Sequence, residues 1–503
     1  MSTTSPIPMP PAVQQSTHSS ETTIEQVSFG FFRIARRLLP WLQWSLAAIA
    51  VGILFLAGLS KLLLFTVVAA PLALLLQLWL DHSGSVLPIL PSYLAIQSLV
   101  YLLPLAGTSI PSAWFDRFEL TSSVAGALFI WLFSIGGGWF LTSASLGVVA
   151  NRSPLGLAQN QPLLAHQLLG LTLLSRFIYV IPEIWSAFGA ESASALALIR
   201  VVGNLAASTG GFLGAYRWSI GALPVAWTWW LLLGIILFQS FATLLLSSAQ
   251  VLIFSVLLGL WLGRPKRALP VTLMAIALVA VLQQGKAVLR NRYWEEGTGS
   301  SALVRLSPTQ LVQEWLDASF KTAPSSESAK KASLVDRVSN LYNLFYVADR
   351  LESGTPTMDG GSLAVIPKVL VPRFLNPTKV RGQEGQVLLN LHFGRQRSRR
   401  QTQTTYIAWG FLPEAVGNYG LFMGPLLYGL TVGALIRICE NLGRYQTLLS
   451  SAGLLSLGLS VIWISSYEMV ASTFVGSAAQ IVVLIVILAL AIGSGSSSST
   501  SRR

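Results

Sequence analysis

Three basic residues, Arg373, Lys379 and Arg381, lie in a proline-rich stretch whose composition suits the binding of a phosphate group. Prolines recur every five residues between positions 367 and 377, so a regular helix is blocked there and several φ angles are fixed. A stiff backbone holds side chains in place at low entropic cost. Arginine offers a planar fork that matches phosphate oxygens, and lysine offers a compact charge. The three side chains could converge on an anionic group; contact with phospholipid headgroups is the alternative.

A single carboxylate, Glu414, stands where the polar part of the chain gives way to an apolar run. Ionisable groups at such a boundary are rare, and they tend to face the protein interior or a water-filled cavity. Glu414 could act as a general base or orient an acceptor hydroxyl. A salt bridge to a loop arginine, or a place at a helix N-terminus, would also explain it. The nearby Gly417, Gly420 and Gly424 are more typical of close helix packing than of a phosphate-binding loop.

Two more arginines, Arg337 and Arg350, lie on a helix predicted over residues 333–353, where apolar residues recur at spacings of three and four. Aspartates adjacent in sequence do not face them on a helix, so local pairing does not neutralise their charge. They are candidate phosphate ligands, with a solvated helix face as the alternative. Another helix is predicted to start at Ser307, with Pro308 in its first turn.

The chain that must position these residues is mostly apolar. It has 503 residues, a mean hydropathy of +0.62 and only 11% charged residues, against about 25% in soluble domains. Continuous apolar runs recur that are long enough to cross a hydrocarbon core of about 30 Å, unlike the alternating pattern of a β-barrel. We predict an all-α polytopic membrane protein with about twelve transmembrane helices. The predicted spans are residues 38–58, 62–80, 86–107, 121–145, 163–183, 192–213, 224–243, 245–262, 268–285, 415–437, 448–468 and 471–493.

Short basic segments predict the orientation of these spans. Arg36 and Arg37 precede the first span and place the N-terminus in the cytoplasm, and basic residues after the fourth, eighth, tenth and twelfth spans then fall on the same side. Both termini are therefore predicted to be cytoplasmic. Nine crossings place the polar segment 286–405 outside, and this segment carries 17 Lys and Arg residues against 10 Asp and Glu. Ligand binding would explain this external positive charge.

The predicted organisation has five parts. These are a disordered cytoplasmic tail (1–37), an N-terminal transmembrane bundle of about nine helices (38–285), an external, periplasmic and partly helical loop domain (286–405), about three C-terminal transmembrane helices (406–493) and a disordered tail (494–503).

Composition argues against several other classes of protein. The net charge of +13 is expected of a membrane protein with basic cytoplasmic loops, and without a soluble basic domain we expect no nucleic-acid binding. The single cysteine, Cys439, excludes an intrachain disulfide and a Cys-based metal cluster. The four histidines, including His392, lack metal-ligand spacing. A run of arginines between 395 and 400 is either an electrostatic attractor or a solvated loop.

Residues 334–424 resemble the bacterial O-antigen polymerase-like proteins, which polymerise oligosaccharide repeat units. The likeness begins with a polar external loop and a helix with an early arginine. Its motifs are Val371-Pro372-Arg373-Phe374-Leu375-Asn376-Pro377-Thr378-Lys379, then Phe393-Gly394, then Pro413-Glu414 and Asn418-Tyr419-Gly420-Leu421-Phe422-Met423-Gly424. The sequence departs from the family pattern at Asn376, Val380, Ala415 and Tyr419.

The resemblance implies a membrane-embedded polymerase of the bacterial cytoplasmic (inner) membrane. It would join oligosaccharide repeat units carried on undecaprenyl diphosphate at the external face, with membrane lipids, a chain-length regulator and a flippase as partners. Guanidinium groups would neutralise the leaving diphosphate and a carboxylate would take the acceptor proton, so neither a metal nor a cofactor is required. The implied catalytic residues are Glu414 and Arg373, and the implied diphosphate ligands are Arg373, Lys379, Arg381, Arg337 and Arg350.

Three alternatives remain open from the sequence. A ligase that transfers a finished glycan to another acceptor would use the same basic loop. A transporter or flippase of lipid-linked glycans would place ionisable residues in the middle of several spans and break helices near the midplane. The predicted spans hold few charges, which favours chemistry at the membrane surface over transport. A receptor or sensor is the third possibility.

Overall fold

The computed structural model describes residues 24–82, 87–107, 110–145, 163–180, 192–242, 246–293, 308–320, 339–371, 376, 379–404, 407–444 and 450–496. Every regular element in these ranges is a helix. The N-terminal helices are α1 (Ile24–Ala57), α2 (Leu59–His82), α3 (Ile89–Leu102), η1 (Leu103–Ala106), α4 (Ser112–Asp116), α5 (Phe118–Ser145), α6 (Leu164–Val180), α8 (Ser192–Ile220), α9 (Ala226–Ala242), α10 (Leu246–Gly263) and α11 (Pro265–Tyr293).

The C-terminal half alternates short helices with long ones. Its elements are α12 (Pro308–Phe320), α14 (Asn340–Glu352), η4 (Leu363–Val365), α15 (Ile366–Leu370), α16 (Glu384–His392), α17 (Arg399–Thr404), α18 (Phe411–Gly443), α19 (Ser451–Ser465), η5 (Ser466–Glu468) and α20 (Ala471–Ser496).

Each of the twelve predicted spans overlaps one of these helices, so the all-helical prediction is confirmed for the described residues. Among the described residues, six helices are long and apolar enough to cross a membrane: α1, α2, α3 with η1, α5, α11 and α18. Large apolar side chains such as Phe133, Met274 and Phe422 are exposed on their outer faces, as expected where lipid covers the protein. The fold is compatible with a membrane protein, and the number of spans stays a prediction.

Several predicted boundaries differ from the observed ones. Helix α1 begins at Ile24, well before the predicted start of the first span at residue 38. Helix α12 begins at Pro308, as predicted. Helix α14 begins only at Asn340, because the Ser339 side chain accepts a hydrogen bond from the Tyr342 amide and caps the helix there. The predicted start of that helix at residue 333 lies outside the described residues.

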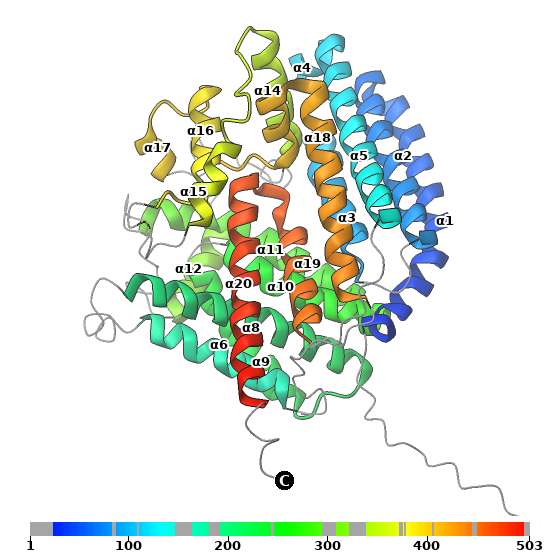
Figure 1. The fold of residues 1–503 in the computed structure, drawn as a ribbon. Helices are drawn as coiled ribbons and strands as arrows, with labels where there is room; N and C mark the ends of the chain where they lie inside the picture. Colours follow the sequence, from blue (N-terminus) through cyan, green and yellow to red (C-terminus); the bar gives the residue numbers. More distant parts are fainter. Residues whose placement is uncertain are drawn as a thin grey trace, which may run out of the picture.

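The long helices form two groups. Helices α1, α2, α3, α5 and α18 run side by side on the right of Figure 1, and α6, α8 and α9 lie lower and to the left. Contact is most extensive between α5 and α18, where small residues bring the backbones together. A Cβ added to Gly433 would lie 2.0 Å from the Ile135 carbonyl oxygen, and one added to Gly138 would lie 2.1 Å from that of Leu430. Any side chain here would push the two helices apart.

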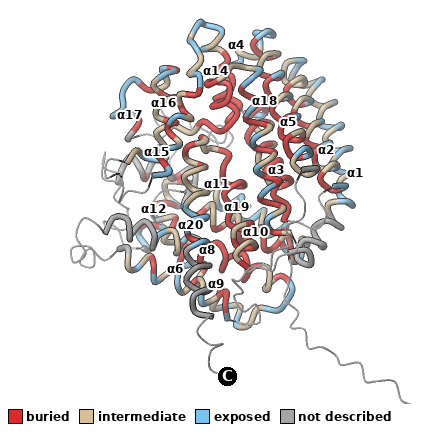
Figure 2. Tube along the Cα trace, viewed as in Figure 1, coloured by how far each residue is buried: buried red, intermediate tan, exposed pale blue. Residues whose placement is uncertain are grey.

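The described helices of the polar segment 286–405 pack on different long helices, and its predicted organisation as one domain stays a prediction. Helix α12 packs on α11, whereas α14 packs on α18 and α5, and α15 and α16 pack on α20. Figure 1 places α14 to α17 together at the top and upper left, with α12 below them. We call residues 339–404 the polar cap. Figure 2 shows that buried residues concentrate along α14 and α18, where the cap meets the long helices.

Candidate functional site

Helix α18 is broken at Gly420, which has φ 78° and ψ 178°. Such a conformation is open essentially to glycine alone. Ala415 and Gly424 would lie about 13.5 Å apart in a continuous helix, yet a Cβ added to Gly424 would lie 2.1 Å from the Ala415 carbonyl oxygen. The chain therefore turns back on itself at Gly420. The short first half of α18 packs against the long second half, which runs down beside α5 (Figure 1).

Glu414 lies in the short half of α18 and has no exposed surface. Its Oε1 accepts a hydrogen bond from the Ser362 hydroxyl at 2.7 Å, and its Oε2 accepts one from the Ala471 amide at 2.6 Å. The Asn418 side-chain amide donates to the Ser362 hydroxyl at 2.8 Å and to the Glu414 carbonyl oxygen at 2.9 Å. The carboxylate thus holds the polar cap, α18 and the start of α20 together.

The polar cap also covers the break in α18 through its backbone. The amides of Met358 and Asp359 donate to the carbonyl oxygens of Gly417 and Asn418, each at 3.0 Å. These are carbonyls that the end of the short half-helix would otherwise leave without partners. The turn 358–362 is therefore fitted to the broken helix, and it carries Ser362 to Glu414.

The first turn of α20 joins Glu414 to the basic segment. The hydroxyls of Ser472 and Thr473 donate to the Gly382 carbonyl oxygen at 2.8 and 3.0 Å. Gly382 follows Arg381 directly, so these bonds fix the backbone of the basic segment beside the residue that binds Glu414. Lys379 is half-buried and Arg381 is exposed. The structure thus joins the backbone that directly follows these two predicted ligands to the turn of α20 that binds Glu414.

The other predicted ligands have different outcomes. Arg373 and Arg337 lie outside the described residues. Arg350 is exposed at the end of α14, where its guanidinium lies 5.3 Å from the Tyr346 ring centroid and donates to the Tyr346 hydroxyl at 3.3 Å. Its described contacts are with Tyr346 and not with the Glu414 network, so the structure does not join Arg350 to that network.

Arg395 is fixed in the polar cap, although the sequence placed it in a run of solvated or mobile arginines. It donates to the Asn343 side-chain oxygen and lies over the rings of Tyr342, Tyr346 and Trp409, with ring centroids at 5.3, 5.6 and 5.9 Å. Burial lowers the pKa of this guanidinium. Because three aromatic rings and the Asn343 side chain already contact its guanidinium, Arg395 stabilises the cap and is a poor candidate for binding substrate.

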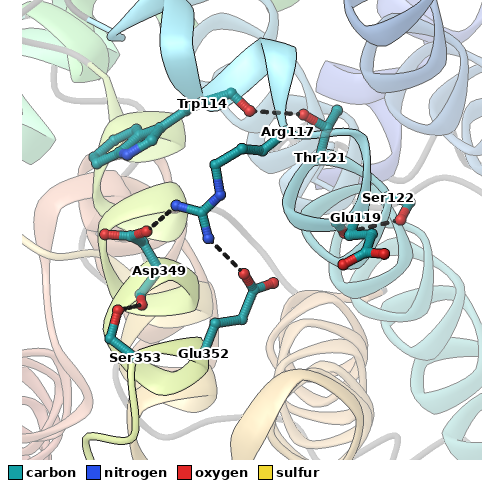
Figure 3. Close-up of polar contacts among 8 residues, drawn as sticks. All are labelled: Trp114, Arg117, Glu119, Thr121, Ser122, Asp349, Glu352 and Ser353. Atoms are coloured by element: carbon teal, nitrogen blue, oxygen red, sulfur yellow. Dashed lines mark hydrogen bonds and ion pairs between the residues drawn. The ribbon is translucent and has the colours of Figure 1, made fainter.

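Arg117 ties the start of α5 to the polar cap. Figure 3 shows its guanidinium between Asp349 and Glu352 of α14. The distance to the Glu352 carboxylate is 2.8 Å. The hydrogen bond that the Arg117 guanidinium donates to the Asp349 carboxylate is the main reason that the pKa of Arg117 is raised. The acidic residues of α14 therefore have a partner distant in sequence, which helical spacing alone did not predict.

A second buried carboxylate, Glu440, lies near the other end of α18. It accepts hydrogen bonds from the indoles of Trp79 and Trp139, at 3.0 and 2.8 Å, and from the Leu90 amide at 3.0 Å. The Arg437 guanidinium lies 3.6 Å from it. Glu440 thus joins α2, α3, α5 and α18, and this arrangement is a structural clamp rather than an open site.

Among the residues that the structure describes, no three His, Cys, Asp or Glu side chains gather in a group that could hold a metal ion. The groups near the break in α18 are a buried carboxylate and two hydroxyls of α20, with Lys379 and Arg381 just before the Gly382 that these hydroxyls bind. Lys and Arg side chains are the groups that bind an anionic phosphate in proteins. Searches against protein-family models, curated proteins and solved structures give no match to this chain.

Proposed function

We propose that this protein is a membrane-embedded glycan polymerase of the bacterial cytoplasmic membrane. It would join oligosaccharide repeat units linked to undecaprenyl diphosphate at the external face of that membrane. The observation that carries the proposal is the anchoring of Lys379 and Arg381, through Gly382 and the first turn of α20, to the buried Glu414 network. The resemblance of residues 334–424 to O-antigen polymerase-like proteins supports the same reading.

The reaction needs positive charge where the diphosphate leaves. As the acceptor hydroxyl attacks the anomeric carbon, the bond to the diphosphate breaks and negative charge grows on its oxygens. Fixed cations stabilise that charge. In this proposal Arg381 and Lys379 bind the diphosphate, and Arg373 acts with them.

Glu414 has a different task in the described conformation. Both of its oxygens accept hydrogen bonds and its side chain has no exposed surface, so it positions the basic segment and the turn 358–362. Its role as the base that takes the acceptor proton stays a prediction. That role requires the turn 358–362 to move away from α18, because a general base must reach the proton that it removes.

Contacts between helix ends support the predicted sidedness. If the spans alternate in direction, two ends can touch only when they lie on the same side of the membrane. Described contacts join ends predicted to be external to one another, and ends predicted to be cytoplasmic to one another. Examples of external pairs are Lys61 with Leu105, Arg117 with Asp349, and Gln250 with Tyr467; examples of cytoplasmic pairs are Arg36 with Leu80 and Arg267 with Ser219.

The test is genetic complementation in the source organism, read as the length of its surface polysaccharide. Deletion of the gene should reduce the product to single repeat units, and the wild-type gene should restore long chains. Arg381→Ala and Arg373→Ala should each shorten the chains, because the leaving diphosphate loses a cation. Arg397→Ala is the matched control: Arg397 is an exposed arginine of the same cap, and its loss should leave chain length unchanged.

The outcomes also separate the alternatives. A ligase mutant would accumulate full-length chains on the lipid carrier, and a transporter mutant would retain lipid-linked units at the cytoplasmic face. If Arg381→Ala and Arg373→Ala enter the membrane at wild-type levels and give wild-type chain lengths, the proposed site is wrong.

A further inference from the structure

Helix α12 has two apolar faces but only one of them is covered. Leu311 and Trp315 are buried with Leu289 of α11. A second stripe, made of Val312, Leu316 and Phe320, is exposed at 44%, 43% and 71%. These three residues are four apart, so they line one side of the helix. We call them the outer stripe.

The position of α12 relates the outer stripe to the apolar part of α11. The Trp315 indole donates to the Leu282 carbonyl oxygen at 2.7 Å, and a Cβ added to Gly285 would lie 2.6 Å from the Ser319 hydroxyl. Leu282 is the last residue of the candidate membrane span of α11, which starts at Pro265. Helix α12 therefore begins beyond this span and packs back along α11 toward Leu282, where the span ends.

The distances place α12 at the level where a bilayer ends. Leu289, in the same buried cluster as Leu311, lies about 10 Å beyond Leu282 along a helix that rises 1.5 Å per residue. Only 11% of the α11 span is buried inside the protein, so lipid would have to cover most of it. Lipid that reaches Leu282 also reaches the C-terminal half of α12, since Trp315 is bonded there.

We propose that α12 is an interfacial helix whose outer stripe inserts into the surface of the lipid bilayer beside α11. A helix of this kind lies in the membrane plane, with its apolar side about 5–10 Å deep at the boundary between headgroups and acyl chains. The other exposed positions of α12, Thr309, Gln310 and Gln313, are polar, and Gln310 lies on the side of the helix opposite Val312. The inference requires α11 to span the membrane but does not depend on glycan chemistry.

The test uses environment-sensitive probes on single cysteines. The one native cysteine, Cys439, is buried and is replaced by serine. Val312→Cys, Leu316→Cys and Gln310→Cys are then labelled with a nitrobenzoxadiazole fluorophore, and the full chain is placed in nanodiscs with or without lipids that carry a nitroxide near the headgroup. Gln310→Cys is the matched control. Gln310 lies on the same turn as Val312, but a separation of two residues places it on the opposite side of the helix.

We expect blue-shifted emission and strong nitroxide quenching at positions 312 and 316, and water-like emission with weak quenching at position 310. Two results would overturn the proposal. Water-like emission at all three positions would mean that the outer stripe is solvated. Blue-shifted emission at 312 and 316 without quenching by the nitroxide lipids would mean that protein covers the stripe, either another part of this chain or a second copy. Elution as one species in size-exclusion chromatography checks that each variant is folded.

Discussion

At the scale of single residues, the Glu414 network depends on the Ser362 hydroxyl. Ser362→Ala removes the donor to Oε1, and no water can replace it without an opening, since both side chains are fully buried. An unsatisfied buried group costs about 1–3 kcal/mol, so we expect the free energy of unfolding to fall by that amount. Thermal unfolding in detergent measures the change. Ser122→Ala, which removes an exposed hydroxyl bonded to the Glu119 carbonyl, should have little effect, and equal stability of both variants would contradict the proposed network.

The sequence predicted only part of this network, for reasons of distance along the chain. Glu414 was found because a carboxylate at the edge of an apolar run is unusual. Ser362 lies 52 residues from Glu414 and 56 from Asn418, and no local pattern connects hydroxyls and amides over such separations. Glu440 was missed because the predicted tenth span ended at residue 437, which left this buried carboxylate in an assumed loop.

At the scale of helices, the break at Gly420 can be tested with an alanine substitution, which adds one methyl group. A Cβ there would meet no atom within 4 Å, so Gly420→Ala acts only through the backbone, which costs about 1–3 kcal/mol in this conformation. We expect lower thermal stability and loss of activity. Gly126→Ala is the control, since Gly126 lies inside α5 and also has free space around it; alanine should stabilise that helix by about 0.5–1 kcal/mol. Equal effects of the two substitutions would argue against the break.

Hydropathy identified the long helices correctly, yet it did not predict that α18 turns back on itself. Apolar composition continues through Gly420, so the pattern alone indicates one uninterrupted helix. The reversal depends on contact between Ala415 and Gly424 and on amides of Met358 and Asp359 that satisfy the freed carbonyls. The start of α14 depends on a local contact instead, because the Ser339 side chain caps the helix and the spacing of apolar residues alone does not show that cap.

At the scale of the whole molecule, the pairing of Arg117 with α14 predicts the side on which the polar cap lies. Both belong to segments predicted to be external. A reporter that is active only outside the cytoplasm, such as alkaline phosphatase, should therefore be active when inserted at Gly354 and inactive at Arg264. Gly354 is a suitable site because it follows the end of α14 and is exposed. Activity at Arg264 with none at Gly354 would reverse the orientation and remove the proposed site from the external face.

The fit between the polar cap and the long helices limits how this protein can be dissected. Leu341, Leu344 and Phe345 of α14 are fully buried, and Trp114 near the start of α5 stacks on Phe345 with ring centroids 5.8 Å apart. A soluble fragment cut from residues 339–404 would expose this apolar face of α14 to water and lose the backbone hydrogen-bond partners that α18 supplies. Truncated versions should therefore aggregate, and biochemical work on the cap must retain the intact chain in detergent or lipid.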